Sequence, residues 1–415
     1  MLKSDRGVSW WGISLAVAIL MSTVSCGYTQ SPSIVLQLND VEFERPAPSG
    51  EPHLTSAAGD RALLTWLEPV DEAIWALRLV VRDGGEWSTP QTIHSSDQLF
   101  VNWADFPSSV EMADGSIIAH WLERSADARY AYHVMLSLSS NGGVTWSEPF
   151  RAHDDTSPTE HGFVSLVPWD GGAALVWLDG RAMWKQEEDE GLEAGAMSVR
   201  FRTVDSEGIL GPEVLLDDRT CECCQTALAR GNEGLIAAYR DRSMEEIRDI
   251  AIVRGGGEHW SNPSLISQDG WEVPGCPVNG PQLSAIDESL VATWYTGVGG
   301  DPKAYVAFSK DGGATFGRRI RIDEGLPLGR LDVEQLDDGS AVVVWLEASD
   351  DSPRVMARRV TASGELDMAL VISETSQMRA SGFPRMTRVG DELLLAWTLA
   401  DEEGGIRVRS VGLTE

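Results

Sequence analysis

The sequence predicts an all-β protein: a β-propeller of seven four-stranded blades, with six blades as the alternative. Three observations lead to this prediction. One aromatic motif recurs along the whole chain, short Val, Ile and Leu runs alternate with Gly- and Asp-containing turns, and no long apolar pattern of helical period follows the N-terminal segment. A repeat of about fifty residues with several strands per unit is typical of a propeller blade, which buries its faces only by stacking on its neighbours.

The N-terminal segment precedes the repeat and has the features of an export signal. Lys3 and Arg6 come before a mostly apolar stretch, 10–21, which is too short to span a bilayer. The segment ends in TVSC at 23–26, which resembles the lipobox of bacterial lipoproteins. That resemblance implies a signal peptide over residues 1–25, a lipid on Cys26, and a protein anchored in the cell envelope, at the periplasmic or outer face of the outer membrane.

The recurring motif is an apolar run, then an aromatic residue, then a polar or acidic one. Its seven copies are spaced by 55, 56, 62, 55, 51 and 52 residues and carry Trp66, Trp121, Trp177, Tyr239, Trp294, Trp345 and Trp397. The last unit, 383–413, is one strand short, whereas the strand-like segment 33–41 has no partner of its own. We therefore predict that this segment closes the ring in the seventh blade. Residues 26–50 would hold the lipidated N-terminus and closing strand, and residues 51–415 the propeller.

Two turns of the repeat carry a second signature. The sequences SSNGGVTW (139–146) and SKDGGATF (309–316) resemble the Asp box of the sialidase superfamily. In such a turn the Asp or Asn accepts backbone N–H groups, the glycines adopt positive φ, and the aromatic residue packs between strands. The resemblance implies a sialidase-like propeller. Its site is expected on the axial face, where the loops entering the innermost strands meet.

Charge limits the possible partners. Lys plus Arg number 33 against 64 Asp plus Glu, a formal net charge of -31. A nucleic-acid-binding protein must neutralise phosphates with a basic surface, so this class is excluded. An electrostatic grip on anionic lipid is excluded for the same reason, which leaves the lipid anchor as the expected membrane contact. The sequence indicates neither a cofactor nor an oligomeric state.

The segment TCECCQTA (220–227) concentrates Cys221, Cys223 and Cys224 in one loop, and Cys276 lies in the segment that enters the next unit. Three interpretations are open. An even number of cysteines outside the cytoplasm favours two disulfides. Alternatively, the thiolates, with His53 or His161, bind a soft metal such as Zn²⁺ or Cu⁺. In the third interpretation one thiol is reactive.

Hydrolases of the sialidase superfamily use a Tyr nucleophile with a Glu, an Asp acid/base, and three Arg that bind the substrate carboxylate. The resemblance assigns acid/base roles to Glu222, which enters the first strand of unit four, and to Asp105. It assigns the binding of an anionic group to the arginines at and after the second strand of that unit, which are Arg240, Arg242 and Arg248. Trp103 is the predicted aromatic platform.

The chain also departs from the hydrolase pattern, because no Tyr follows Tyr305 and Lys303 stands where an Arg is expected. The sequence therefore predicts first a protein that binds a carbohydrate, or another anionic ligand or partner, on its axial face. An exo-glycosidase of sialidase type and a metal-binding envelope protein that uses the cysteines are the alternatives.

Overall fold

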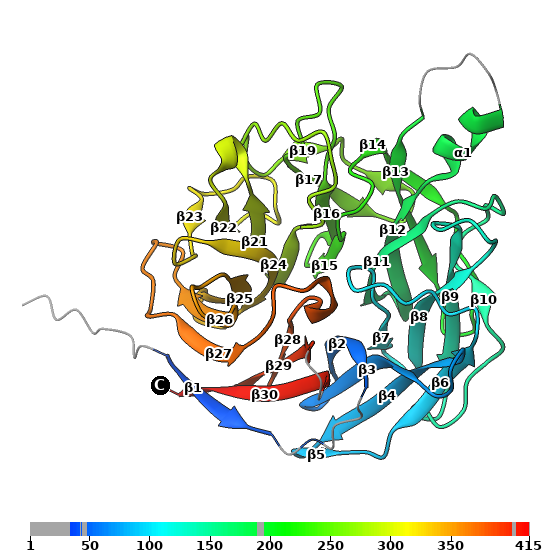
Figure 1. The fold of residues 1–415 in the computed structure, drawn as a ribbon, viewed down its shortest axis with the longest axis horizontal. Coiled ribbons are helices and arrows are strands. Elements are labelled where there is room, and N and C mark those ends of the chain that lie inside the picture. The colour runs from blue at the N-terminus through cyan, green and yellow to red at the C-terminus, as the bar shows by residue number, and fades with distance from the viewer. Residues whose placement is uncertain (1–33, 42, 44–47, 189–194, 401–403, 415) are drawn as a thin grey trace, which may run out of the picture. The chain divides into compact units, whose positions relative to one another are not determined.

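The computed structural model describes residues 34–41, 43, 48–188, 195–400 and 404–414. Residues Val35–Thr414 form the folded unit considered below. It contains seven antiparallel sheets that follow one another around an axis in chain order (Figure 1). The predicted seven-bladed propeller is confirmed, and the alternative of six blades is wrong. The predicted signal peptide and the lipidation site Cys26 lie outside the described residues and stay predictions.

Each blade begins with its innermost strand. Blade 1 comprises β2 (Gly50–Ala57), β3 (Arg61–Pro69), β4 (Trp75–Asp83), β5 (Glu86–Trp87) and β6 (Gln91–Ser96). Blade 2 comprises β7 (Ser108–Glu111), β8 (Ile117–Arg124), β9 (Tyr132–Ser139) and β10 (Phe150–Arg151). Blade 3 comprises β11 (His161–Trp169), β12 (Gly172–Asp179), β13 (Met197–Val204) and β14 (Val214–Thr220). Blade 4 comprises β15 (Ala227–Gly231), β16 (Gly234–Arg240), β17 (Ile250–Gly256), β18 (His259–Trp260) and β19 (Ser264–Leu265).

The remaining blades follow the same order. Blade 5 comprises β20 (Gln282–Ile286), β21 (Ser289–Thr296), β22 (Lys303–Ser309) and β23 (Ile320–Arg321). Blade 6 comprises β24 (Pro327–Gln335), β25 (Ala341–Glu347), β26 (Arg354–Val360) and β27 (Leu370–Glu374). Blade 7 comprises β28 (Arg385–Val389), β29 (Glu392–Leu399), β30 (Gly405–Thr414) and β1 (Val35–Asp40).

The two ends of the chain complete blade 7 together. β1 pairs antiparallel with β30 in a register that runs from Val35 opposite Thr414 to Asp40 opposite Arg409. The blue β1 and the red β30 lie side by side in Figure 1. This pairing is the predicted ring closure. It covers an edge of β30 that would otherwise present unpaired backbone groups.

The recurring aromatic residue lies on the second strand of every blade and is buried. Trp177 and Trp345 are fully inaccessible to solvent, as is Tyr239, which replaces Trp in blade 4. Because side chains alternate along a strand, the acidic residue two positions on shares the same face. Trp177 Nε1 donates to Asp179 at 2.9 Å, and Trp345 Nε1 donates to Glu347 at 2.6 Å. In these blades the polar end of the motif therefore accepts the indole N–H that burial would otherwise leave unpaired.

Two turns between third and fourth strands share one hydrogen-bond pattern. In blade 2, Ser139 Oγ accepts from Gly143 N at 2.8 Å, and Asn141 Oδ1 accepts from Thr145 N at 2.9 Å. In blade 5 the corresponding distances, at 309–315, are 2.9 Å for both contacts. Gly143 has a φ of 88°, which a residue with a side chain rarely adopts. The turn chemistry expected from the two sequence signatures is thus present.

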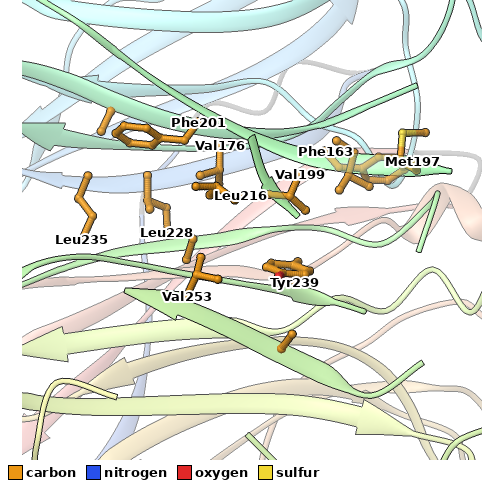
Figure 2. Close-up of a cluster of buried hydrophobic side chains, with 14 of the residues drawn as sticks. Phe163, Val176, Met197, Val199, Phe201, Leu216, Leu228, Leu235, Tyr239 and Val253 are labelled. Carbon is orange, nitrogen blue, oxygen red and sulfur yellow. The ribbon is translucent and has the colours of Figure 1, made fainter. Parts of the chain in front are cut away.

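Adjacent blades pack face to face through apolar side chains. Figure 2 shows the cluster between blades 3 and 4, where Val176 and Phe201 face Leu228 and Val253. Its members come from strands far apart in the sequence, so each blade depends on its neighbours for burial. Among the described residues the only α-helix is α1 (Arg181–Glu188), inserted between β12 and β13, with short 3₁₀ turns η1 (Val298–Gly300) and η2 (Arg379–Ser381). None of these helices has the length and apolar character needed to cross a membrane.

Removal of residues 1–40 is expected to lower the melting temperature by at least about 5 °C, because it opens the β30 edge, and to promote association of molecules through that edge. Removal of residues 1–33, which keeps β1, is the matched control and should melt like the longer chain. Calorimetry and size-exclusion chromatography measure both effects. Equal melting of the two truncated forms would contradict a stabilising role for the closing strand.

Candidate functional site

The loop that carries three of the cysteines lies between β14 and β15 and is tied to two other blades. Gln225 Nε2 donates to Ala104 O at 2.7 Å, and Gly280 N donates to Gln225 Oε1 at 3.0 Å. A Cβ added at Gly280 would lie 2.0 Å from Gln225 O, so only glycine allows this approach. Loops of blades 2, 4 and 5 therefore meet on the axial face, as expected from the sequence.

The four cysteines beyond the N-terminal segment are free thiols, and Cys276 is the exposed one. Cys221 Sγ lies 3.3 Å from Cys224 Sγ and 4.0 Å from Cys223 Sγ, so the described residues contain no S–S bond here. Hydrogen bonds from Cys223 and Cys224 hold the pKa of Cys221 well below its ordinary value. Cys276 also exchanges a hydrogen bond with Cys223, which lowers the pKa of Cys276. The predicted proximity of the two cysteine segments is present.

Beside the thiols, two arginines and two glutamates form a closed network. Arg242 pairs with Glu222 and, at 2.7 Å, with Glu246. Arg248 contacts both carboxylates at 2.8 Å, and its Nη1 also donates to Cys221 Sγ at 3.2 Å. The predicted acid Glu222 and the predicted ligand-binding arginines Arg242 and Arg248 are thus brought together. They neutralise one another in this arrangement.

Arg240, predicted to bind an anionic group, is only 1% exposed. Its guanidinium donates to the backbone carbonyls of Asn279 at 2.7 and 3.0 Å, Arg248 at 2.6 Å and Tyr295 at 2.7 Å. The ring of Trp271 lies 4.9 Å from its Cζ. Arg240 therefore braces the loops of blades 4 and 5, and each nitrogen of its guanidinium already donates to a carbonyl.

Asp105, the second predicted acid, is buried at the start of blade 2. Its Oδ1 accepts from Phe163 N at 2.7 Å, and burial raises its pKa well above the ordinary value. Nearby, Tyr132 donates to Glu160 at 2.5 Å, and burial raises the pKa of Glu160 to about 7. Burial therefore favours the protonated form of Asp105, whereas Glu222 lies in the ion-pair network.

A cavity of about 250 Å³ lies among the innermost strands of all seven blades. Asp105 lines it, together with His53, Gln225, Gln282, Asp332, Glu334 and Arg385. Glu222 and the arginines of its network are not part of the lining. The structure therefore separates the two predicted acids: one lines the axial cavity and the other belongs to the thiol-bearing loop region.

Arg385, at the start of β28, is the only Arg or Lys among the described residues that line this cavity. Its Nη2 lies 3.2 Å from His53 Nε2, and its Nε lies 3.5 Å from Asp332 Oδ2. Within the described chain its buried Nη1 has no hydrogen-bond partner. Burial holds the pKa of His53 well below its ordinary value and raises that of Glu334 to about 8. The guanidinium of Arg385 thus lies beside an imidazole that burial keeps uncharged and within 3.5 Å of the Asp332 carboxyl group.

Aromatic rings lead from Arg385 to the predicted platform Trp103. Arg385 lies over Phe106 at 5.0 Å, Phe106 contacts Phe383 at 5.8 Å, and Phe383 stacks on Trp103 at 5.9 Å. Arg330 lies 4.7 Å from the Trp103 ring, where a register shift in β24 and a φ of 55° place it. Arg379 lies 5.9 Å from the same ring. The sequence analysis did not single out Arg330, Arg379 or Arg385. Arg330 and Arg385 nevertheless lie on innermost strands, next to the axial loops where the site was expected.

Three histidines form a second cluster that the sequence did not reveal. His133, His153 and His161 place one nitrogen each within 4.8 Å of the others, and the rings of His153 and His161 stack at 3.9 Å. His53 lies instead beside Arg385, and neither His53 nor His161 belongs to the thiol cluster. The suggestion that one of them joins the cysteines is therefore wrong, because β2 and β11 hold both rings elsewhere.

Comparisons with known proteins support the fold. A protein of unknown function from Dyadobacter fermentans is 14% identical, with a TM-score of 0.53 over 91% of this chain and 98% of that one. The polysaccharide lyase Uly1 is 11% identical, with a TM-score of 0.51 over 93% and 94%. The NanB sialidase from Streptococcus pneumoniae is 12% identical, with a TM-score of 0.45 over 91% and 71%. No protein-family profile and no curated protein matches the sequence. At these identities the likeness to the first two shows the propeller fold alone.

Replacement of Arg240 by Met is expected to destabilise the protein by about 3–5 kcal/mol, because it leaves buried carbonyls without donors. Arg242→Gln, in the partly exposed network, should cost less than about 1 kcal/mol. Denaturant unfolding followed by tryptophan fluorescence measures both. A similar small loss for the two variants would show that Arg240 is not a brace.

Stability is expected to fall as pH rises from about 4.5 to about 8, in part because of Glu334. Burial raises its folded-state pKa from 4.5 to about 8, and the nearby Asp332 adds to the shift. In this window the unfolded state loses the proton that the folded state keeps, so deprotonation favours unfolding, by about 1–3 kcal/mol in total. Glu334→Gln should flatten this part of the profile in melts at several pH values. A profile parallel to that of the unaltered protein would contradict the assignment.

Proposed function

We propose that the protein binds a carbohydrate that carries a carboxylate, in the axial cavity and beside the aromatic rings that adjoin it. The observation that carries this proposal is Arg385: a buried guanidinium in the cavity lining whose Nε and Nη1 have no hydrogen-bond partner within the described chain. A guanidinium and a carboxylate form strong, charge-assisted hydrogen bonds. The sequence-based assignment of ligand binding to Arg240, Arg242 and Arg248 is less favoured, because Arg240 donates to backbone carbonyls and the other two are paired with Glu222 and Glu246 outside the cavity lining.

The surroundings of Arg385 suit a sugar. Gln225 and Gln282 offer amide groups, and the protonated forms of Asp105 and Glu334 can donate hydrogen bonds to hydroxyl groups. Trp103 is half-buried, adjoins the cavity through Phe383 and Phe106, and is an aromatic ring on which a sugar ring can stack. The cavity is smaller than the roughly 300–1,000 Å³ of sites for drug-sized ligands, so we infer that it takes one sugar unit rather than a chain.

A second candidate function is glycoside cleavage. Asp105 favours it, because it lines the cavity and a carboxyl group whose pKa burial raises is suited to protonate a leaving-group oxygen. The fold is shared with proteins named as a polysaccharide lyase and a sialidase, although that likeness supports only the scaffold. Turnover of a fluorogenic uronide or sialoside that is lost in Asp105→Asn would favour this function over binding alone.

The binding proposal predicts that glucuronate binds and that glucose, its neutral counterpart, binds at least about tenfold more weakly. Arg385→Gln should reduce the affinity for glucuronate roughly tenfold to a hundredfold and leave that for glucose unchanged. Trp103→Ala should weaken both. Saturation-transfer NMR and calorimetry on the folded variants measure these affinities.

Arg242→Gln is the matched control, since it removes one arginine charge on the axial face outside the cavity lining. It should leave glucuronate binding unchanged. The opposite result, with binding lost in Arg242→Gln and kept in Arg385→Gln, would place the ligand on the network around Glu222, as the sequence analysis predicted. Binding that no cavity variant alters would overturn the proposal.

A further inference from the structure

The thiols of the loop after β14 converge more closely than an ordinary loop requires. Cys221 and Cys224 are each 1% exposed, and their sulfur atoms lie 3.3 Å apart. Cys223 Sγ lies 4.0 Å from Cys221 Sγ on its other side. The three sulfur atoms of this loop all lie within 4.8 Å of one another. Cys276, in the loop that enters the neighbouring blade, is exposed and lies outside this group.

These separations are far longer than the 2.05 Å or so of a disulfide bond. Four sulfurs held at about 2.3 Å from one ion in a tetrahedron lie about 3.8 Å from each other. The observed values of 3.3 and 4.0 Å lie on either side of that spacing. We propose that Cys221, Cys223 and Cys224 bind one soft metal ion, Zn²⁺ or Cu⁺, through their thiolates, and that Cys276 joins them as the fourth ligand when the ion is bound. This inference does not rest on the proposed ligand binding.

The neighbouring charges fit an anionic metal–thiolate centre. Zn²⁺ with four thiolates carries a net charge of −2, which needs cationic donors around it in a buried place. Arg248 supplies one, because its Nη1 donates to Cys221 Sγ at 3.2 Å. The buried guanidinium of Arg240 also acts on Cys221 and Cys224 through its charge. Hydrogen bonds of this kind to ligand atoms orient them and tune the affinity for the metal.

The loop is held in place without an ion. Thr220 Oγ1 donates to Arg240 O at 2.6 Å, and Gln225 fixes the other end between blades 2 and 5. Three sulfurs are therefore already positioned, and exposed Cys276 offers both a path for the ion and the fourth ligand. Four protein ligands make a closed site, which is typical of structural rather than catalytic centres. The ion would join blade 4 to blade 5.

The test uses the full chain, purified anaerobically with reductant and washed with a weak chelator, and measures bound metals by mass spectrometry of the elements. The expected result is about one Zn²⁺ or Cu⁺ per chain, and the element found distinguishes the two. Zn²⁺ or Cu⁺ added to the stripped protein should raise its melting temperature. Co²⁺ in place of the native ion should give the charge-transfer absorption of thiolate ligation.

Cys224→Ser should abolish metal retention, and Cys276→Ser, an exposed change that the fold tolerates, should weaken it at least tenfold. His133→Ala is the matched control, because the histidine cluster is the other place in the described chain where three ligand atoms gather. It should retain the full metal content. Retention by Cys276→Ser equal to that of the unaltered protein, loss in His133→Ala alone, or a metal-free chain with thiols that oxidise to disulfides would overturn the proposal.

Discussion

Burial of one aromatic side chain per blade is the constraint on which the propeller depends. A Trp on the second strand fills the space between neighbouring sheets, but its indole N–H then needs an acceptor away from water. In blades 3 and 6 the acceptor is the acid two residues on, in the same strand. In blades 4 and 5 it comes from the preceding blade: Tyr239 donates to Asp217 at 2.6 Å, and Trp294 donates to Asp269 at 2.7 Å. There the aromatic residue also links the two blades.

This constraint explains why the sequence predicts the fold so well. The buried aromatic residue recurs at the end of an apolar run in every blade, so the motif is visible without any structure, and its period gives the number of blades. The longest spacing, 62 residues between Trp177 and Tyr239, corresponds to the segment that contains α1. The helix itself was not predicted, because RAMWKQEE has no apolar face to bury. Ring closure was predictable because the last of the seven units lacked one strand, and the N-terminal segment offered a strand without a partner.

The candidate site was less predictable, because the sequence shows where an arginine lies but not what its guanidinium contacts. Arg240 and Arg385 both stand at a strand end on the axial face. Arg240 lies among the loops and donates to three backbone carbonyl groups. Arg385 lines the cavity instead. The difference is set by the Asn279 and Tyr295 carbonyls, which approach from blade 5. The histidine cluster was equally invisible, since its members come from β9, a loop and β11 without a common spacing.

The thiol cluster and the cavity are joined by one side chain. Gln225 follows Cys224 directly, and its amide donates to the carbonyl of Ala104, the residue between the platform Trp103 and the cavity acid Asp105. The cysteine loop is therefore hydrogen-bonded directly to the segment that carries both residues. A metal ion that fixes this loop would limit its movement without touching the ligand, in the way that supporting contacts hold a binding site in place. The cysteines and the arginine of the cavity can thus serve one site from different blades, although their chemistry is separate.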